Sequence, residues 1–398
     1  MFELIDEWGP EKVVCVSDAR TGMRGVLVID NTARGMGKGG TRMSTTVTVG
    51  EVARLARNMT WKWAGVDLFY GGAKAGIWAN PNAESKEAVL RAFVRALKNE
   101  VPEEYVFGLD VGLTETHAAI MLDEVGGPGG AVGTPYALGG LPYDQLGVTG
   151  YGVAESADAA AQAIGLATGS LSTSIQGLGA VGAAAAKRLA ELGTTVVAVS
   201  TSQGGIHNPD GLDVTTLLEL REQYGNGLVG HYTDAKPLAA GEDLSITADI
   251  LIPAALQDVI DADRASTVSA KIIVEGANLP SSPAAQRVLF ERGVTVVPDF
   301  IANAGGVVAA AVAMDARYSG IRPEPAAVFD NISSKLRAST IETLAASQAQ
   351  GRTTHEVARS IAQRRVREAM ELRGRVPAPP RSEVLPGESR HISTESRR

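Results

Sequence analysis

The segment Gly177-Leu-Gly-Ala-Val-Gly182 decides the fold, because it combines the spacing GxGxxG with a preceding apolar stretch and a following helix-forming stretch. In such a strand–turn–helix, the first glycine permits a tight turn and the second lets a pyrophosphate approach the backbone, while the third lets the helix pack on the strand. The helix N-terminus adds free N–H groups and the positive end of a dipole. The segment therefore predicts a dinucleotide site, with Gly177, Gly179, Ala180 and Val181 nearest the cofactor.

Alternating strand and helix patterns surround this segment. The predicted strands are 172–176, 195–200, 248–252, 271–275 and 294–297, and the predicted helices include 151–164, 180–192, 305–317, about 325–348 and about 353–373. Such alternation is typical of a parallel sheet covered by helices on both faces. The fold class is thus predicted to be α/β, with a Rossmann-type domain over residues 149–350.

Residues 1–148 have a different character, and the length of 398 residues is enough for two domains. Strands are expected at 13–17 and 24–29 and helices at 51–66 and after Asn80-Pro-Asn82, with 68–70 and 75–78 flanking a glycine-rich turn and 126–147 a loop. A second α/β domain is therefore predicted here. Residues 376–398 are rich in Pro, Ser and charge, and we expect a disordered tail.

Composition limits the function classes. The formal net charge of −8 argues against nucleic-acid binding, and the single cysteine, Cys15, fits a reducing compartment. We find no signal peptide and no apolar stretch of 18 residues, so no membrane span is expected and the cytoplasm is the predicted location. The five histidines lack metal-ligand spacing, so no metal site is predicted and they are expected to be surface or packing residues.

The strand that follows the glycine-rich segment ends at Ser200-Thr201-Ser202 without a carboxylate. A carboxylate at this place grips the ribose hydroxyls of NAD. The hydroxyl of Thr201 would not repel a ribose phosphate, so NADP is favoured, with NAD or the use of both left open.

Three lysines of the first domain have glycine-rich or aromatic neighbours, and an isolated aspartate follows them. They are Lys38 in Gly37-Lys-Gly-Gly40, Lys62 in Met59-Thr-Trp-Lys62, Lys74 in Gly71-Gly-Ala-Lys74, and Asp110 in Gly108-Leu-Asp110. One such lysine alone would indicate a surface charge, but the set favours a shared cleft. Burial and mutual repulsion there would lower the lysine pKa values, so that a lysine can act as a general base.

Together these segments resemble the glutamate/leucine/phenylalanine/valine dehydrogenase family over about residues 10–375. The resemblance rests on the lysine and glycine segments above and on Asn31-Thr-Ala-Arg-Gly35, Val274-Glu-Gly-Ala-Asn278, Pro298-Asp-Phe-Ile-Ala-Asn303-Ala-Gly-Gly306 and 364–374. It implies an N-terminal substrate domain, to which about residues 351–375 return, a Rossmann domain, and a closed homo-oligomer, most often a hexamer.

The resemblance also implies site roles. Lys74 would activate the water that attacks the imino acid, Asp110 would move protons at the amino group, and Lys62 would hold the α-carboxylate. The substrate set further includes Lys38, Gly39, Gly40, Thr149, Asn303, Val307 and Ala310, and the cofactor set Thr149, Thr201, Ala254, Asn278 and Asn303, besides the glycine-rich segment. The implied reaction transfers hydride from an amino acid Cα to the nicotinamide, and imine hydrolysis then gives a 2-oxo acid and ammonium, reversibly.

The resemblance implies that Lys38 binds a distal carboxylate, as the corresponding lysine does in glutamate-type members, whereas leucine- and phenylalanine-type members carry an apolar residue there. Lys38 therefore favours L-glutamate as the substrate, because a buried cation without an anionic partner would be costly. Three departures from the glutamate type leave an apolar or aromatic amino acid open: Ala310 replaces a serine ligand, Leu109 precedes Asp110, and 142–147 lacks the usual Arg-Glu. A non-catalytic dinucleotide-binding homologue is the alternative of another class. The presence of Lys74 and Asp110 argues against it.

Overall fold

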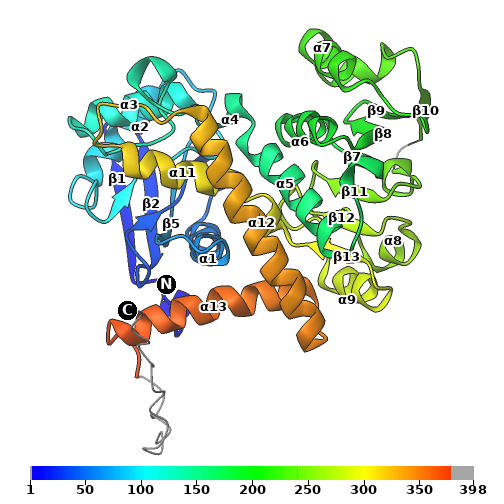
Figure 1. The fold of residues 1–398 in the computed structure, drawn as a ribbon. Coiled ribbons are helices and arrows are strands. Elements are labelled where there is room, and N and C mark those ends of the chain that lie inside the picture. The colour runs from blue at the N-terminus through cyan, green and yellow to red at the C-terminus, as the bar shows by residue number, and fades with distance from the viewer. Residues whose placement is uncertain (1, 240, 378–398) are drawn as a thin grey trace, which may run out of the picture.

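The chain folds around two sheets built from separate stretches of sequence (Figure 1). The computed structural model describes residues 2–239 and 241–377. The first sheet has the order β1-β2-β5-β3-β6, and β4 also pairs with β5. Its strands are β1 (Lys12–Asp18), β2 (Met23–Asn31), β3 (Gly37–Lys38), β4 (Thr41–Ser44), β5 (Gly71–Trp78) and β6 (Tyr105–Val106).

The second sheet has the order β10-β9-β8-β7-β11-β12-β13. Its strands are β7 (Ser172–Gln176), β8 (Thr195–Thr201), β9 (Gly204–His207), β10 (Lys236–Leu238), β11 (Ile250–Pro253), β12 (Ile272–Val274) and β13 (Thr295–Val297). The five strands from β8 to β13 in this order are parallel. At one edge, β9 pairs antiparallel with β8, and β10 pairs antiparallel with β9. This is the predicted Rossmann-type sheet with an added antiparallel edge.

Helices cover both sheets and connect them. They are α1 (Val49–Gly65), α2 (Lys86–Ala96), α3 (Glu115–Val125), α4 (Tyr143–Leu146), α5 (Val148–Ala163), α6 (Ala180–Glu191), α7 (Val214–Tyr224), α8 (Ala262–Thr267), α9 (Pro283–Glu291), α10 (Asp299–Ala302), α11 (Gly305–Ala316), α12 (Pro325–Gln350) and α13 (Thr354–Leu372). Short 3-10 turns occur at Phe2–Leu4, Tyr136–Leu138, Thr168–Ser170, Gly225–Gly230 and Glu242–Leu244.

The long helix α12 runs between the two sheets, and α13 then crosses beneath α1 (Figure 1). Helix α5 approaches both α6 and α12 closely, because it is rich in alanine and glycine. A Cβ at Gly150 would lie 2.2 Å from the carbonyl oxygen of Val181, and a Cβ at Gly152 would lie 2.5 Å from Cδ2 of Leu336. Small residues of α5 therefore set how closely this helix packs against α6 and α12.

The predicted α/β class with two domains is confirmed, and most predicted elements are present. One local prediction is wrong: Gly71 and Gly72 are part of the continuous strand β5, not of a turn between two strands. A Cβ at Gly72 would lie 2.0 Å from Oγ1 of Thr60, so glycine here lets α1 approach the strand. The helix expected right after Asn80 starts only at Lys86, and the antiparallel β9–β10 edge was not predicted. The predicted tail begins at residue 376, and its part from residue 378 onward lies outside the described residues.

The segment Asp299–Ala316 corrects the expectation that no stretch is apolar enough to cross a membrane. By length and composition it passes that test, with a mean hydropathy of 1.3, but 61% of it is buried inside the protein. It consists of two helices, α10 and α11, which end and begin around Asn303. Its apolar side chains, among them Ile301, Val308 and Ala309, belong to the main core, and that burial accounts for its hydropathy.

Two isoleucines on α12 provide a test of this packing. Ile332 is fully buried, whereas Ile341 on the same helix is 51% exposed. We expect Ile332→Ala to lower the free energy of unfolding by about 2–5 kcal/mol, through lost burial and the cavity left behind. Ile341→Ala should change it by less than about 0.5 kcal/mol. Chemical denaturation of both variants measures the difference, and equal losses would contradict the placement of α12.

Candidate active site

The predicted catalytic lysine and aspartate form an ion pair at the end of the first sheet. Lys74 lies on β5 and is 7% exposed, and its Nζ is 3.1 Å from Oδ2 of Asp110. Lys38 lies on the neighbouring strand β3, opposite Gly72 of β5. Its Nζ donates a hydrogen bond to the carbonyl oxygen of Val106 at 3.0 Å. The third lysine, Lys62, comes from the last turn of α1.

Arg42 completes this cluster, although the sequence analysis assigned it no role. It lies on β4, and its Nε donates to Oδ2 of Asp110 at 2.8 Å while its Nη1 donates to Oε1 of Glu51 at 2.7 Å. Asp110 therefore receives two cations, and Arg42 is held in turn by a second carboxylate. Its position four residues after Lys38 was the only signal in the sequence, because the contact with Asp110 spans 68 residues.

Glycines make the close approach of these groups possible. A Cβ at Gly39 would lie 1.7 Å from the carbonyl oxygen of Ala73, and a Cβ at Gly40 would lie 2.9 Å from Cβ of Asp110. At Gly108 a Cβ would lie 2.6 Å from Nζ of Lys38. The predicted substrate glycines thus hold the backbone near Lys74 and Asp110, and Gly108 leaves room for the Lys38 ammonium.

Burial shifts the titration of the lysines. It lowers the pKa of Lys38 to about 7, an effect to which the charges of Lys74 and Arg317 add. It lowers the pKa of Lys62 to about 8 against the opposing charge of Asp299. The pKa of Lys74 is also lowered by burial, which the charge of Asp110 partly offsets. Burial would raise the pKa of Asp110, but the charges of Lys74 and Arg42 outweigh it and hold that pKa below its ordinary value.

The glycine-rich segment has the geometry of a phosphate-binding turn. Gly177 has a φ of +88°, in the left-handed region, and a Cβ at Gly182 would lie 2.0 Å from the carbonyl oxygen of Gly177. Gly179 precedes α6, whose first N–H groups have no side-chain cap, and no atom lies within 4 Å of a Cβ built there. The first helical residues, Ala180 and Val181, therefore begin a helix whose N-terminus is open to an anion, which fits a dinucleotide.

The end of β8 lies beside this turn. Ser200 accepts a hydrogen bond from the N–H of Gly177 at 3.2 Å, while the hydroxyl of Thr201 donates to the carbonyl oxygen of Asn226 at 2.7 Å. Arg221 of α7 reaches the same turn, and its Nε donates to the carbonyl oxygen of Leu178 at 2.8 Å. The sequence analysis missed Arg221, because it lies 43 residues from Leu178.

A second group of predicted residues gathers at the carboxyl ends of β11 and β12. Asn303 Nδ2 donates to Oδ1 of Asn278 at 3.0 Å. The buried Oδ1 of Asn303 has no hydrogen-bond partner within the described part of the chain, so it is available to a ligand. A Cβ at Gly276 would lie 3.2 Å from that of Ala254 and 3.4 Å from Cγ1 of Val181.

Thr149 joins this second group from α5. A Cβ at Gly306 would lie 3.2 Å from Oγ1 of Thr149, so this threonine lies beside the segment that begins α11. The lysine cluster and the asparagine group meet at Asp299, which begins α10 and acts electrostatically on Lys62. The structure thus places both groups of predicted residues around one region between the domains.

Val307 and Ala310 lie on α11. Val307 is part of the main core, and Ala310 is partly buried against it. Further along α11, however, Met314 and Ala313 pack with Val106, the residue whose carbonyl accepts the bond from Lys38, and with Tyr143 of α4. Helix α11 therefore supplies an apolar wall next to Lys38.

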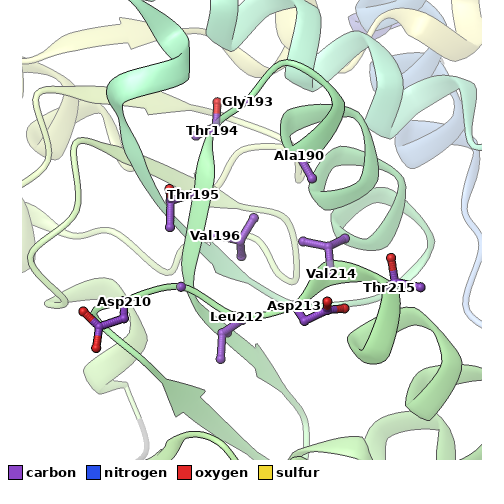
Figure 2. Close-up of a pocket in the computed structure, with 11 residues that line it drawn as sticks. Ala190, Gly193, Thr194, Thr195, Val196, Asp210, Leu212, Asp213, Val214 and Thr215 are labelled. Carbon is purple, nitrogen blue, oxygen red and sulfur yellow. The ribbon is translucent and has the colours of Figure 1, made fainter.

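The surface pocket in Figure 2 lies elsewhere. It has a volume of about 490 Å³ and is lined by Gly193–Val196 at the amino end of β8, and by Asp210–Thr215. Ligands of parallel sheets bind at the carboxyl ends of the strands, where Gly177 and Thr201 lie. We therefore assign this pocket no part in the chemistry of the predicted site.

Comparison with known proteins identifies the family of the chain. The model described as Glu/Leu/Phe/Val dehydrogenase, dimerisation domain, matches residues 10–126, and the model described as Glutamate/Leucine/Phenylalanine/Valine dehydrogenase matches residues 139–374. A glutamate dehydrogenase of Aeropyrum pernix is 38% identical over 70% of this chain and 68% of its own length. An NADP-specific glutamate dehydrogenase of Saccharolobus shibatae is 38% identical over 78% and 77%.

Among solved structures, the hetero-hexameric glutamate dehydrogenase of Thermus thermophilus in its Leu-bound form superposes with a TM-score of 0.81 at 31% identity, covering 94% of this chain and 93% of that one. The fold and the site together define an oxidoreductase that acts on amino acids. The chain belongs to the glutamate/leucine/phenylalanine/valine dehydrogenase family.

The lysine pKa values can be tested independently of any activity. Competitive labelling with acetic anhydride across pH, followed by peptide mass spectrometry, reports the fraction of each lysine that is uncharged. We expect half-maximal reactivity near pH 7 for Lys38 and near pH 8 for Lys62. Lys12 is a control, because its hydrogen bond to Glu104 raises its pKa. Titration of Lys38 together with Lys12 would contradict the burial of Lys38.

Proposed function

We propose that this protein catalyses the reversible oxidative deamination of L-glutamate to 2-oxoglutarate and ammonium with NADP or NAD. The observation that carries this proposal is Lys38. Lys38 is 2% exposed and borders an apolar wall, and within the described residues its Nζ donates its hydrogen bond to a backbone carbonyl and not to a carboxylate. A buried cation without an acidic partner is costly unless a ligand supplies the anion. The distal carboxylate of glutamate is such an anion.

The lysines divide the recognition of the substrate. Lys62 would hold the α-carboxylate and Lys38 the distal carboxylate, so that the substrate lies across the Lys74–Asp110 pair. Gly39 and Gly40 would shape the floor, while Thr149, Asn303, Val307 and Ala310 would face the substrate from the cofactor domain. The cations flanking the pair are consistent with binding of a dicarboxylate.

The Lys74–Asp110 pair supports proton transfer in both directions. Asp110 remains a carboxylate, because Lys74 and Arg42 lower its pKa, and it can accept a proton from the substrate ammonium. The pKa of Lys74 is lowered by burial, so Lys74 gives up its proton more readily than an exposed lysine and can activate the water that hydrolyses the imine. When bound, NAD(P) supplies the acceptor for the hydride that leaves the substrate Cα.

The cofactor would lie along Gly177–Gly182, with its phosphates at the N–H groups of Ala180 and Val181. Thr201 would face the adenosine ribose, and Ala254, Asn278, Asn303 and Thr149 would line the nicotinamide half. NADP is favoured over NAD for two reasons: β8 ends without a carboxylate, and Arg221 is hydrogen-bonded to the turn at Leu178.

We further propose the limits of the domains and the assembly. Residues 1–148 and about 351–375 would form the substrate domain, and 149–350 the cofactor domain. Ala362, Val366 and Met370 of α13 pack against Trp61 and Ala64 of α1, which supports this return of the chain. A closed homo-oligomer, with a hexamer as the favoured form, and a cytoplasmic location complete the proposal.

A substrate and cofactor screen tests the proposed reaction. L-glutamate and a panel of apolar and aromatic amino acids are offered with NAD and with NADP, and the absorbance of the reduced cofactor is followed. We expect the highest kcat/KM with glutamate. A preference for leucine, phenylalanine or valine would show that Lys38 does not recognise the side chain of the substrate. No turnover in either direction would favour a non-catalytic homologue.

Lys38→Leu separates these outcomes on the protein itself. Losing a charge-assisted hydrogen bond costs about 1.5–3 kcal/mol, so kcat/KM for glutamate should fall about ten- to a hundredfold. Lys98→Leu, an exposed lysine of the same domain, is the matched control and should leave it unchanged. A rate on the best substrate that Lys38→Leu barely alters would refute recognition of a distal carboxylate.

Arg221→Gln tests the cofactor preference. If the guanidinium contacts the ribose phosphate, KM for NADP should rise about tenfold while KM for NAD changes little, because only NADP carries that phosphate. Arg287→Gln on the exposed side of α9 is the control. An equal change for both cofactors would place Arg221 at a group that they share, and would remove one of the two reasons for favouring NADP.

A further inference from the structure

A buried histidine lies where the last helix meets the cofactor sheet, and the proposed reaction does not use it. His355 is in the first turn of α13, and its side chain is 13% exposed. Its Nε2 is 2.7 Å from Oε2 of Glu275, whose side chain is 1% exposed and which follows β12. This corrects the expectation that the histidines are surface or packing residues. The pair connects a helix packed on α1 to the carboxyl end of the cofactor sheet.

The carboxylate of Glu275 leads on to a second buried carboxylate. Its Oε2 also accepts a hydrogen bond from the N–H of Asp299 at 3.0 Å. Oδ2 of Asp299 in turn accepts from the N–H of Leu279 at 2.9 Å. Asp299 starts helix α10, and its side chain also holds a neighbouring loop.

The loop at Leu279 has a strained backbone conformation that needs stabilising contacts. Leu279 has a φ of +51°, in the left-handed region that a branched side chain rarely adopts. It directly follows Asn278, and Asn303 is held to Asp299 from the other side, since its N–H donates to the carbonyl oxygen of Asp299 at 2.9 Å. The two asparagines are then joined by the 3.0 Å bond between their side chains. A path of hydrogen bonds, together with the peptide link between Asn278 and Leu279, thus connects His355 to both asparagines.

The charges of this cluster depend on His355. Burial and the charge of Glu275 raise the pKa of Asp299, while Lys62 and His355 oppose that rise. Burial would lower the pKa of His355, but Glu275 and Asp299 outweigh it and raise that pKa, against the nearby charge of Arg359. The imidazolium therefore compensates two carboxylates that would otherwise repel each other in a buried place.

We propose that His355 is a positioning residue for the nicotinamide cofactor: its ion pair with Glu275 holds Asn278 and Asn303 in the arrangement that binds the nicotinamide half. The inference rests on the proposed use of NAD(P). It assigns a role in binding to a residue of α13, a helix whose later residues pack against α1.

The proposal has a definite pH dependence. His355 carries its charge below its raised pKa. The ion pair is therefore present at pH 6.5 and is lost as the pH rises through the pKa of His355. Cofactor affinity that depends on the pair should decline over the same range. The stability that the pair contributes should be lost in the same direction.

Binding of NADPH and NADH, followed by the fluorescence of the reduced nicotinamide at pH 6.5 and pH 9, tests this without turnover. We expect His355→Gln and Glu275→Gln each to raise Kd at least about fivefold at pH 6.5, the low end of typical coupling between sites. The double variant should be no worse than either single one, because both remove the same pair. The difference from the unaltered protein should shrink as the pH rises through the raised pKa of His355.

His117→Gln is the matched control. His117 closes the capping box of α3 in the other domain, a position that Gln also fills, so this substitution should leave Kd unchanged. If His355→Gln does not fold, His355→Asn is the second variant. A Kd within twofold of the unaltered protein at pH 6.5, with only the melting temperature reduced, would overturn the inference. Failure of the unaltered protein to bind either nucleotide would instead refute the proposed function.

Discussion

The buried ion pair between Lys74 and Asp110 is the interaction on which the rest of the site depends. Its two atoms are 3.1 Å apart, and they come from β5 and from the loop after β6. To bring them together, the chain at Gly39 and Gly40 must pass so close to neighbouring backbone atoms that no side chain fits at these two positions. Arg42 then adds a second cation to Asp110, and Glu51 holds Arg42. The geometry of this end of the sheet is therefore built around one carboxylate.

Burying three lysines near one another opposes folding, since desolvation and mutual repulsion both disfavour their charged forms. The lowered pKa of each lysine expresses that cost. A dicarboxylate substrate would relieve it, because its two anions would pair with Lys38 and Lys62. The same electrostatics that weaken the free protein would thus favour the bound substrate, as is common at sites where function and stability compete.

The connection between the domains has a comparable design. Helix α12 passes between them, and α13 returns to pack on α1 while its first turn holds Glu275 of the cofactor sheet through His355. Asp299 lies between the two regions, hydrogen-bonded to the loop at Leu279 and close enough to Lys62 to affect its pKa. The residues predicted to bind substrate and cofactor are in this way connected by buried charges and not by apolar contacts alone.

The sequence by itself determined the α/β class, the glycine-rich turn and the set of lysines, because each depends on neighbours within a few residues. Gly177–Gly182 constrains a local turn, and hydrophobic periodicity reports which face of a helix is buried. Tertiary structure decided which distant side chains meet these motifs. Arg42 reaches Asp110 across 68 residues, Arg221 reaches Leu178 across 43, and His355 reaches Glu275 across 80. No periodic pattern marks such partners, since an isolated charge has the same appearance in the sequence whether it lies in water or in a buried pair.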